Sequence, residues 1–384
     1  MNKAPPLQND KGYLEQLTWL RGIAAFFVVI THIIRATEVN YLSQSNYTVP
    51  SFFYSSDLGA FGVLLFFTLS GTTLYISHTN KSTSVSHFYI KRFFRIWPAF
   101  AVSLLLYALF QPFFISFYPE IQGFWIEHQF ITAYSATDIM QYLLLVSNVS
   151  GKMGLFNNVY WSLPVEFQYY LIFPLLIISL RYINVFGPLL VGLLLYFIYT
   201  FELSNFVDTK IFMLGFSFCG GVLIGHIYAL FKKKETPLRL PFATSILLSS
   251  FMLASLITNS IITLPDIPII SGIWNWYILL SFFAVISVLF GQIHLPSLIQ
   301  KVLRISGDIS YSAYLYHNII IAILVIFCIQ FSIKDDLQLL IVLLGTLAGT
   351  YYIANLSFTH IEKKGIATGK KICSYLQDSI KETY

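Results

Sequence analysis

Arg21 and His32 are the ionisable side chains of an otherwise apolar segment, Leu17–Ile34. In a helix they lie about three turns apart on one face, with a rise of roughly 16 Å between them. A guanidinium binds anionic oxygens and a neutral imidazole accepts protons, so the two residues suit an anion site and a general base. Two simpler roles stay open: an arginine that reaches for the membrane surface, and a histidine held in an interhelical hydrogen bond.

Glu166 lies in a second apolar segment, within the stretch WSLPVEFQYY. This helix is expected to run in the opposite direction, which places the carboxylate roughly 10 Å from the outer end and at nearly the depth of His32. We therefore predict that Glu166 pairs with His32 and orients it as a general base. Pro164 is expected to break the helix locally beside a cavity. The alternative for Glu166 is a buried polar clamp between helices.

Arg92 and Arg95 lie three residues apart in HFYIKRFFRIWPAF, between two apolar segments. If this stretch is helical, the two side chains share one face. Two guanidinium forks match the oxygens of phosphate groups, which predicts a phosphate-binding site. Ordinary anchoring at lipid headgroups is the alternative.

Tyr311, His317 and Glu362 are supporting candidates. The first two belong to ISYSAYLYHNII, and Glu362 follows the last apolar segment. Their alternatives are core hydrogen bonds for Tyr311 and His317 and a solvated charge for Glu362. Three scattered cysteines and the lack of a metal-binding motif predict that the protein uses no metal.

The composition shows which elements must position these groups. Hydrophobic residues make up 56% of the 384 residues and charged residues only 11%, with a mean hydropathy of +0.70. Soluble proteins carry about 25% charged residues, so much of this surface must face lipid rather than water. A disordered chain, a nucleic-acid binder and a disulfide-stapled domain are excluded. The prediction is an all-α polytopic integral membrane protein.

Apolar stretches of roughly 20 residues are long enough to cross a bilayer as helices. FFTLSG lies in the apolar stretch Leu58–Ile76. It contains Ser70 and Gly71, which we interpret as small residues that allow close helix contact. The sequence has ten such stretches: Leu17–Ile34, Leu58–Ile76, Ile96–Phe117, Val159–Leu180, Ile183–Phe201, Ile211–Phe231, Phe242–Ile262, Ile269–Phe290, Ile309–Phe331 and Leu337–Phe358.

The distribution of cations sets the expected topology. With ten crossings and an inner N-terminus, 19 of the 23 lysines and arginines fall on the cytoplasmic side. A crossing by the short segment Asp138–Val149 would destroy this asymmetry, so that segment is predicted to lie at the outer surface. Both termini are therefore predicted to be cytoplasmic, with residues 1–358 embedded in the membrane and residues 359–384 forming a basic cytoplasmic tail.

The motifs, taken together, resemble the integral-membrane acyltransferase 3 family from about Leu14 to Lys364. Six segments carry the resemblance. They occur in the same order as in the family and at the same places relative to the membrane spans. They are LRGIAAFFVVITH, GVLLFFTLSG, FYIKRFFRIWP, WSLPVEFQYYLIFP, ISYSAYLYHNII and FTHIEKK.

The resemblance implies an acyltransferase that uses acyl-CoA, typically acetyl-CoA, from the cytoplasmic side and no metal. It implies transfer to a hydroxyl of an extracytoplasmic or lipid-linked sugar, as in O-acetylation of surface polysaccharide in the cell envelope. His32 takes the place of the essential histidine and Glu166 that of the acid, so these are the catalytic candidates. Arg21, Arg92 and Arg95 take the places of cofactor-binding arginines. The implied location is the inner membrane, with glycan and lipids as partners and no nucleic acid.

Two other classes of protein stay open at this point. A transporter or flippase for a lipid-linked glycan would also need many crossings and polar groups at mid-depth. A membrane scaffold without catalysis is the second. The acceptor, the acyl chain, a covalent acyl-enzyme and the oligomeric state are not determined by these patterns.

Overall fold

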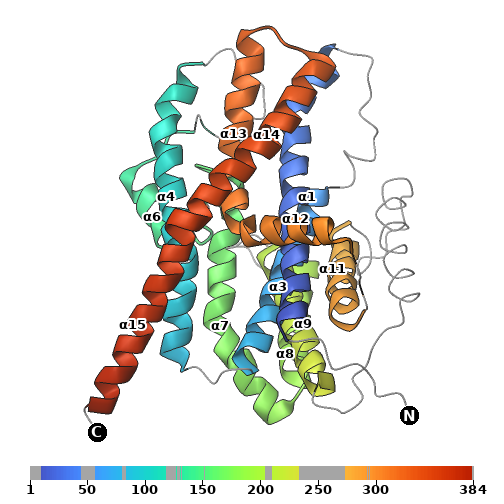
Figure 1. Ribbon diagram of the computed structural model, residues 1–384, viewed down its shortest axis with the longest axis vertical. Helices are drawn as coiled ribbons and strands as arrows, with labels where there is room; N and C mark the ends of the chain where they lie inside the picture. Colours follow the sequence, from blue (N-terminus) through green and yellow to red (C-terminus); the bar gives the residue numbers. More distant parts are fainter. Residues whose placement is uncertain are drawn as a thin grey trace.

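The computed structural model describes residues 10–44, 57–79, 84–117, 127, 130, 132–150, 152–203, 210–232, 273–291, 293 and 295–382. Its long elements are helices throughout, as the composition predicts (Figure 1). The α-helices are α1 (Asp10–Gln44), α3 (Leu58–Thr79), α4 (Val85–Ile115), α6 (Ala136–Leu143), α7 (Ser162–Ile183), α8 (Phe186–Thr200), α9 (Lys210–Lys232), α11 (Ile273–Phe290), α12 (Ser297–Asp308), α13 (Ser310–Gln330), α14 (Asp335–Ser357) and α15 (Lys363–Glu382).

Seven helices in the described part of the chain are long and apolar enough to cross a membrane. Two of the predicted spans appear as shorter apolar helices, Phe186–Thr200 and Asn275–Phe290. The predicted span Phe242–Ile262 lies outside the described residues. The segment predicted to lie at the surface overlaps α6, which has eight residues and is too short to cross. The polytopic all-α prediction is therefore confirmed.

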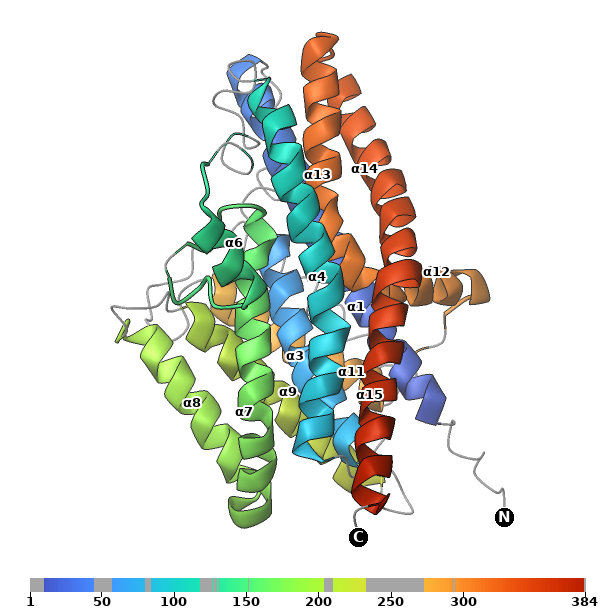
Figure 2. The ribbon, with the colours of Figure 1, turned by 90° about the vertical axis from the view of Figure 1, so that its left-hand side faces the viewer.

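Helix α8 has the exposed apolar surface expected of a helix that faces lipid. It lies at the edge of the bundle (Figure 2), and much of its surface is apolar. A large exposed apolar surface is unfavourable in water but matches the acyl chains of a bilayer. The exposed side chains of this helix are Phe186, Leu189, Leu190, Leu193, Leu194 and Phe197.

Helices α3 and α9 pack so closely that only glycine fits at their contact. A Cβ atom on Gly221 would lie 2.1 Å from the carbonyl oxygen of Thr68, and one on Gly71 would lie 2.2 Å from that of Phe218. The interpretation of the FFTLSG segment as allowing close helix contact is confirmed for Gly71, whereas Ser70 lines a polar cavity instead.

Helix α14 continues through a π-helical turn, η2 (Phe358–Glu362), into α15. Figure 1 shows the three as one long red helix that passes α13 and then α4, and both neighbours make contacts with it. The predicted basic tail is therefore helical and packs along α4. The beginning of α1 and the end of α15 lie at the same end of the molecule in both views (Figures 1 and 2).

Helix α12 crosses α1 near the middle of the bundle (Figure 1). Gly307 allows this crossing, since a Cβ there would lie 1.9 Å from the carbonyl oxygen of Thr18. An ion pair between Arg304 and Glu15, 3.8 Å apart, joins the same two helices. Together these contacts place Arg21, one turn beyond Thr18, in the interior of the bundle.

Candidate functional site

Three arginines from two helices meet in one cavity, which we call the arginine cavity. Arg21 comes from α1, and Arg92 and Arg95 come from one face of α4. The cavity has a volume of about 90 Å³. Its other polar lining residues are Ser70, Thr73, Ser162, Glu166, Tyr170, Ser310, Tyr311 and Tyr314.

Neighbouring side chains hold two of these guanidinium groups in place. Arg21 donates a hydrogen bond from Nη2 to the hydroxyl of Thr73, at 2.9 Å. The guanidinium carbon of Arg92 lies 5.8 Å from the ring centroid of Phe88 and 5.7 Å from that of Tyr170, within cation–π range. An anionic ligand therefore meets guanidinium groups that are already oriented.

Glu166 also lines the arginine cavity, where it is the carboxylate that faces three arginines. The hydroxyl of Tyr170, one turn further along α7, donates a hydrogen bond to it, and Ser70 donates to the Tyr170 hydroxyl at 3.1 Å. Pro164 does not break the helix as expected. It lies in the first turn of α7, where a backbone N–H has no intrahelical partner to lose.

His32 lines a second cavity of about 350 Å³, which we call the histidine cavity. Across it, Arg35 and Asp57 form an ion pair at 3.0 Å. The remaining polar lining residues are Thr31, Asn158, Trp161, Lys210 and Tyr314.

The predicted pairing of His32 with Glu166 is wrong, because the two residues line different cavities. His32 instead pairs with His317 of α13, with 2.8 Å between Nδ1 of His32 and Nε2 of His317. The two ring planes are nearly parallel, at 11°, and the ring centroids lie 5.1 Å apart. Equal depth along two helices did not establish that their side chains point toward each other.

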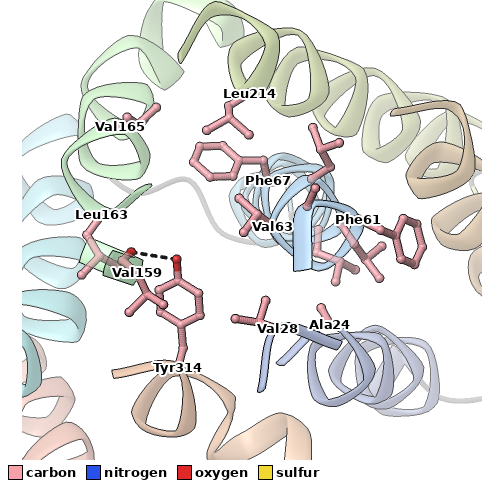
Figure 3. Packing of buried hydrophobic residues seen from close by; sticks show 14 of the residues in the cluster. Ala24, Val28, Phe61, Val63, Phe67, Val159, Leu163, Val165, Leu214 and Tyr314 are labelled. Carbon is pink, nitrogen blue, oxygen red and sulfur yellow. Dashed lines mark hydrogen bonds between the residues drawn. The ribbon is translucent and has the colours of Figure 1, made fainter. Parts of the chain in front are cut away.

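Tyr314 and Val63 line both cavities and form the wall between them. Figure 3 shows the Tyr314 side chain directed at Val159, with Val63 on the opposite helix. The Tyr314 hydroxyl donates a hydrogen bond to the carbonyl oxygen of Val159 at 2.8 Å and accepts one from Ser162 at 2.7 Å. The wall is thus fixed to the start of α7.

The other two supporting candidates, Tyr311 and Glu362, lie in different parts of the structure. Tyr311 lines the arginine cavity and donates a hydrogen bond to the carbonyl oxygen of Ile96 at 2.9 Å. Glu362 lies in the π-helical turn, is only 3% exposed, and accepts a hydrogen bond from Ser312. It is therefore not the solvated charge of the alternative interpretation, and its contact is with α13.

Several lining residues were not singled out from the sequence. Tyr170 had a usable signal, since it lies one helical turn after Glu166 and therefore on the same face. Tyr314 and Ser162 had none, because hydroxyl side chains are common in such segments and their meeting depends on how α7 and α13 pack. The Arg35–Asp57 pair likewise joins α1 to the residue that immediately precedes α3.

A helical bundle that presents apolar faces to lipid and encloses two polar cavities defines a polytopic membrane protein with an internal site. The chain belongs to the acyltransferase 3 family: a family profile described as an acyltransferase domain matches residues 14–355. Acyltransferase MdmB of Streptomyces mycarofaciens is 32% identical over 166 residues, covering 42% of this chain and 38% of that relative. No solved structure matches. The chain is accordingly a polytopic membrane member of this family, and it spans about two fifths of the length of the relative that it matches.

Proposed function

We propose that the protein moves an acetyl group from acetyl-CoA to a hydroxyl of an extracytoplasmic or lipid-linked sugar, and so O-acetylates a surface polysaccharide. We place it in the inner membrane with both termini in the cytoplasm, which the distribution of lysines and arginines supports. The observation that carries the proposal is the pair of adjacent cavities, one lined by three arginines and one lined by His32, which share the wall residues Val63 and Tyr314.

Charge makes the arginine cavity suitable for the donor. Three guanidinium groups face one carboxylate, so the cavity has an excess of positive charge that a bound anion would neutralise. The phosphates of CoA provide that anion, and guanidinium groups bind phosphate oxygens through paired hydrogen bonds. The volume of about 90 Å³ holds only a few water molecules, so donor binding must widen the cavity.

The histidine cavity is large enough for part of an acceptor. Its volume of about 350 Å³ lies in the usual range of small-molecule sites. Trp161 supplies an apolar aromatic surface, while Asn158 and Thr31 supply hydrogen-bonding groups. This mixture suits a sugar ring, which has apolar C–H faces and polar edges.

The proposed reaction takes place at the wall between the cavities. His32 takes the proton of the acceptor hydroxyl while the hydroxyl oxygen attacks the carbonyl carbon of the thioester. The carbon–sulfur bond breaks, and the CoA thiolate leaves and takes the proton from His32. The products are an ester and free CoA, and the histidine returns to its neutral form.

The test uses purified protein in lipid vesicles that contain extracted native glycan, supplied with radiolabelled acetyl-CoA. The expected result is label in the glycan together with release of CoA, and loss of both for His32→Ala. Full activity of a folded His32→Ala protein would overturn the proposed mechanism. Movement of glycan without consumption of acetyl-CoA would instead identify a transporter.

A further inference from the structure

We propose that His317 is a positioning residue that fixes the tautomer of His32, so that Nε2 of His32 is the basic atom. This inference rests on the proposed function for its catalytic meaning. Its geometric basis is independent of the identity of the acceptor, because it concerns only the two rings and one backbone carbonyl group.

The position of the first proton follows from a backbone contact. Nδ1 of His317 lies 3.0 Å from the carbonyl oxygen of Ala313, one turn earlier on α13. A carbonyl oxygen can only accept a hydrogen bond, so Nδ1 of His317 must carry a hydrogen. In a neutral imidazole the other nitrogen, Nε2, then has a lone pair and can only accept.

The second proton follows from the first. Nδ1 of His32 lies 2.8 Å from Nε2 of His317, and one of these two nitrogens must donate. Since Nε2 of His317 can only accept, Nδ1 of His32 carries the hydrogen. The lone pair of His32 is thereby assigned to Nε2, the nitrogen that does not face His317.

Burial explains why both rings are neutral in this arrangement. His32 is 7% exposed and His317 is fully buried. A charge on either ring loses its hydration, and charges on both rings, whose centroids are 5.1 Å apart, would repel each other. The other charged groups that line the cavity beside His32 are Arg35, Lys210 and Asp57.

The pair also accommodates the proton that moves during transfer. When Nε2 of His32 takes the proton of the acceptor hydroxyl, His32 becomes positively charged, and its Nδ1–H donates a stronger, charge-assisted hydrogen bond to His317. His317 stays neutral, because its Nδ1–H remains bonded to Ala313. The proton then passes from Nε2 of His32 to the CoA thiolate, and the starting tautomers are restored.

Two amide substitutions separate the two hydrogen bonds of His317. In His317→Gln the amide oxygen reaches the place of Nε2 and can still accept from His32. In His317→Asn the shorter amide can donate to Ala313 but does not reach His32. The two variants have similar polarity, so each is the matched control for the other.

Activity is measured in vesicles with native glycan and radiolabelled acetyl-CoA. His317→Asn is expected to lower kcat roughly 100-fold or more, since misplacing a general base removes most of its contribution, with KM for acetyl-CoA within about twofold of the wild type. His317→Gln is expected to recover most of kcat. Two results would overturn the inference. Both variants could keep a high kcat, or both could have an equally low kcat while they still bind acetyl-CoA.

A direct measurement on the unmodified protein does not depend on activity. Solid-state NMR of 15N-histidine-labelled protein in lipid distinguishes the two tautomers, and the signal of His32 is assigned by its loss in His32→Asn. We expect hydrogen on Nδ1 of His32, and hydrogen on Nε2 would overturn the inference. A wild-type protein that shows the expected tautomer but does not consume acetyl-CoA would refute the proposed function alone.

Discussion

The hydroxyl of Tyr314 donates a hydrogen bond of 2.8 Å to the carbonyl oxygen of Val159, and this contact fastens the wall between the arginine cavity and the histidine cavity (Figure 3). Both residues are buried, so the bond is shielded from competing water. The position of the Tyr314 ring is therefore set by the turn that precedes α7 as well as by α13.

We predict that Tyr314→Ala raises the hydrolysis of acetyl-CoA relative to acetyl transfer. Removing the ring joins the two cavities, and water then reaches a thioester that is normally sheltered. A change of roughly tenfold in the ratio of hydrolysis to transfer corresponds to about 1.4 kcal/mol. Release of CoA with and without glycan measures this ratio. Tyr314→Phe keeps the ring and is the control, and an unchanged ratio in Tyr314→Ala would contradict the role of the wall.

Arg92→Ala and Arg95→Ala are each predicted to raise KM for acetyl-CoA. Loss of a hydrogen bond to a charged group removes about 1.5–3 kcal/mol, equivalent to roughly 10- to 150-fold in affinity. Initial rates at varied acetyl-CoA measure the change. Lys91→Ala removes a neighbouring cation that is not among the lining residues of either cavity, and it serves as the control. An equal effect of Lys91→Ala would mean that general surface charge attracts the donor.

Glu166→Gln distinguishes the two positions considered for this carboxylate. Since Glu166 faces the arginines and not the histidine pair, we predict an altered KM for acetyl-CoA and an unchanged pH profile of kcat. Had it paired with His32, its loss would shift the limb of that profile that reports the base. Rates between pH 5 and pH 9 measure both quantities, and a shifted limb would restore the pairing that was predicted from the sequence.

Acid is predicted to destabilise the region around α6. A 2.6 Å hydrogen bond from Lys152, together with Ser135, lowers the pKa of Asp138 to about 2. The ionised carboxylate therefore stabilises the fold above the pKa of the unfolded chain, near 4, and this contribution is lost as the pH falls toward about 2. Thermal unfolding in detergent should show that Asp138→Asn is less stable than the wild type at pH 7, with the difference vanishing near pH 2.

The exposed acid Asp378 provides the control for this experiment. Asp378→Asn should leave the midpoint of unfolding close to that of the wild type at both ends of the pH range, because surface substitutions usually change stability little. A constant difference between Asp138→Asn and the wild type down to pH 2 would contradict the assigned linkage.

Gly221→Val is predicted to destabilise the bundle by on the order of 3 kcal/mol, because the added side chain would meet the carbonyl oxygen of Thr68 on α3. The midpoint of thermal unfolding and the yield of monodisperse protein measure this effect. Gly154→Ala is the control, since no heavy atom outside its own neighbours lies within 4 Å of the added Cβ. Wild-type stability of Gly221→Val would show that α3 and α9 separate without loss.

The sequence was a good guide to the helices and to the convergence of Arg92 and Arg95, because both depend on local periodicity. Arg92 and Arg95 share a face at their spacing, and Glu166 and Tyr170 share a face for the same reason. The partner of His32 was not predictable in this way. Its choice between Glu166 and His317 depends on how α1, α7 and α13 are rotated about their axes, which hydropathy does not report.

Two expectations depended on the environment rather than on the pattern. Pro164 was expected to interrupt a helix, but the helix begins only two residues earlier, and its first turn tolerates proline. Glu362 had a solvated charge as its simplest interpretation, but the π-helical turn between α14 and α15 buries it against Ser312. Neither the residue at which α7 begins nor the packing of α13 can be read from the local sequence alone.

The wall formed by Val63 and Tyr314 also bears on the electrical insulation of the membrane. A hydrated cavity on each side of a thin barrier would become a conductive path for protons if the barrier opened. In the proposed reaction an acetyl group and a proton exchange across the barrier with no net charge moved, while the charged phosphates and the glycan stay on their own sides. The same tyrosine would then allow the cell to acetylate glycan at its outer surface from an internal donor without discharging the ion gradient across its membrane.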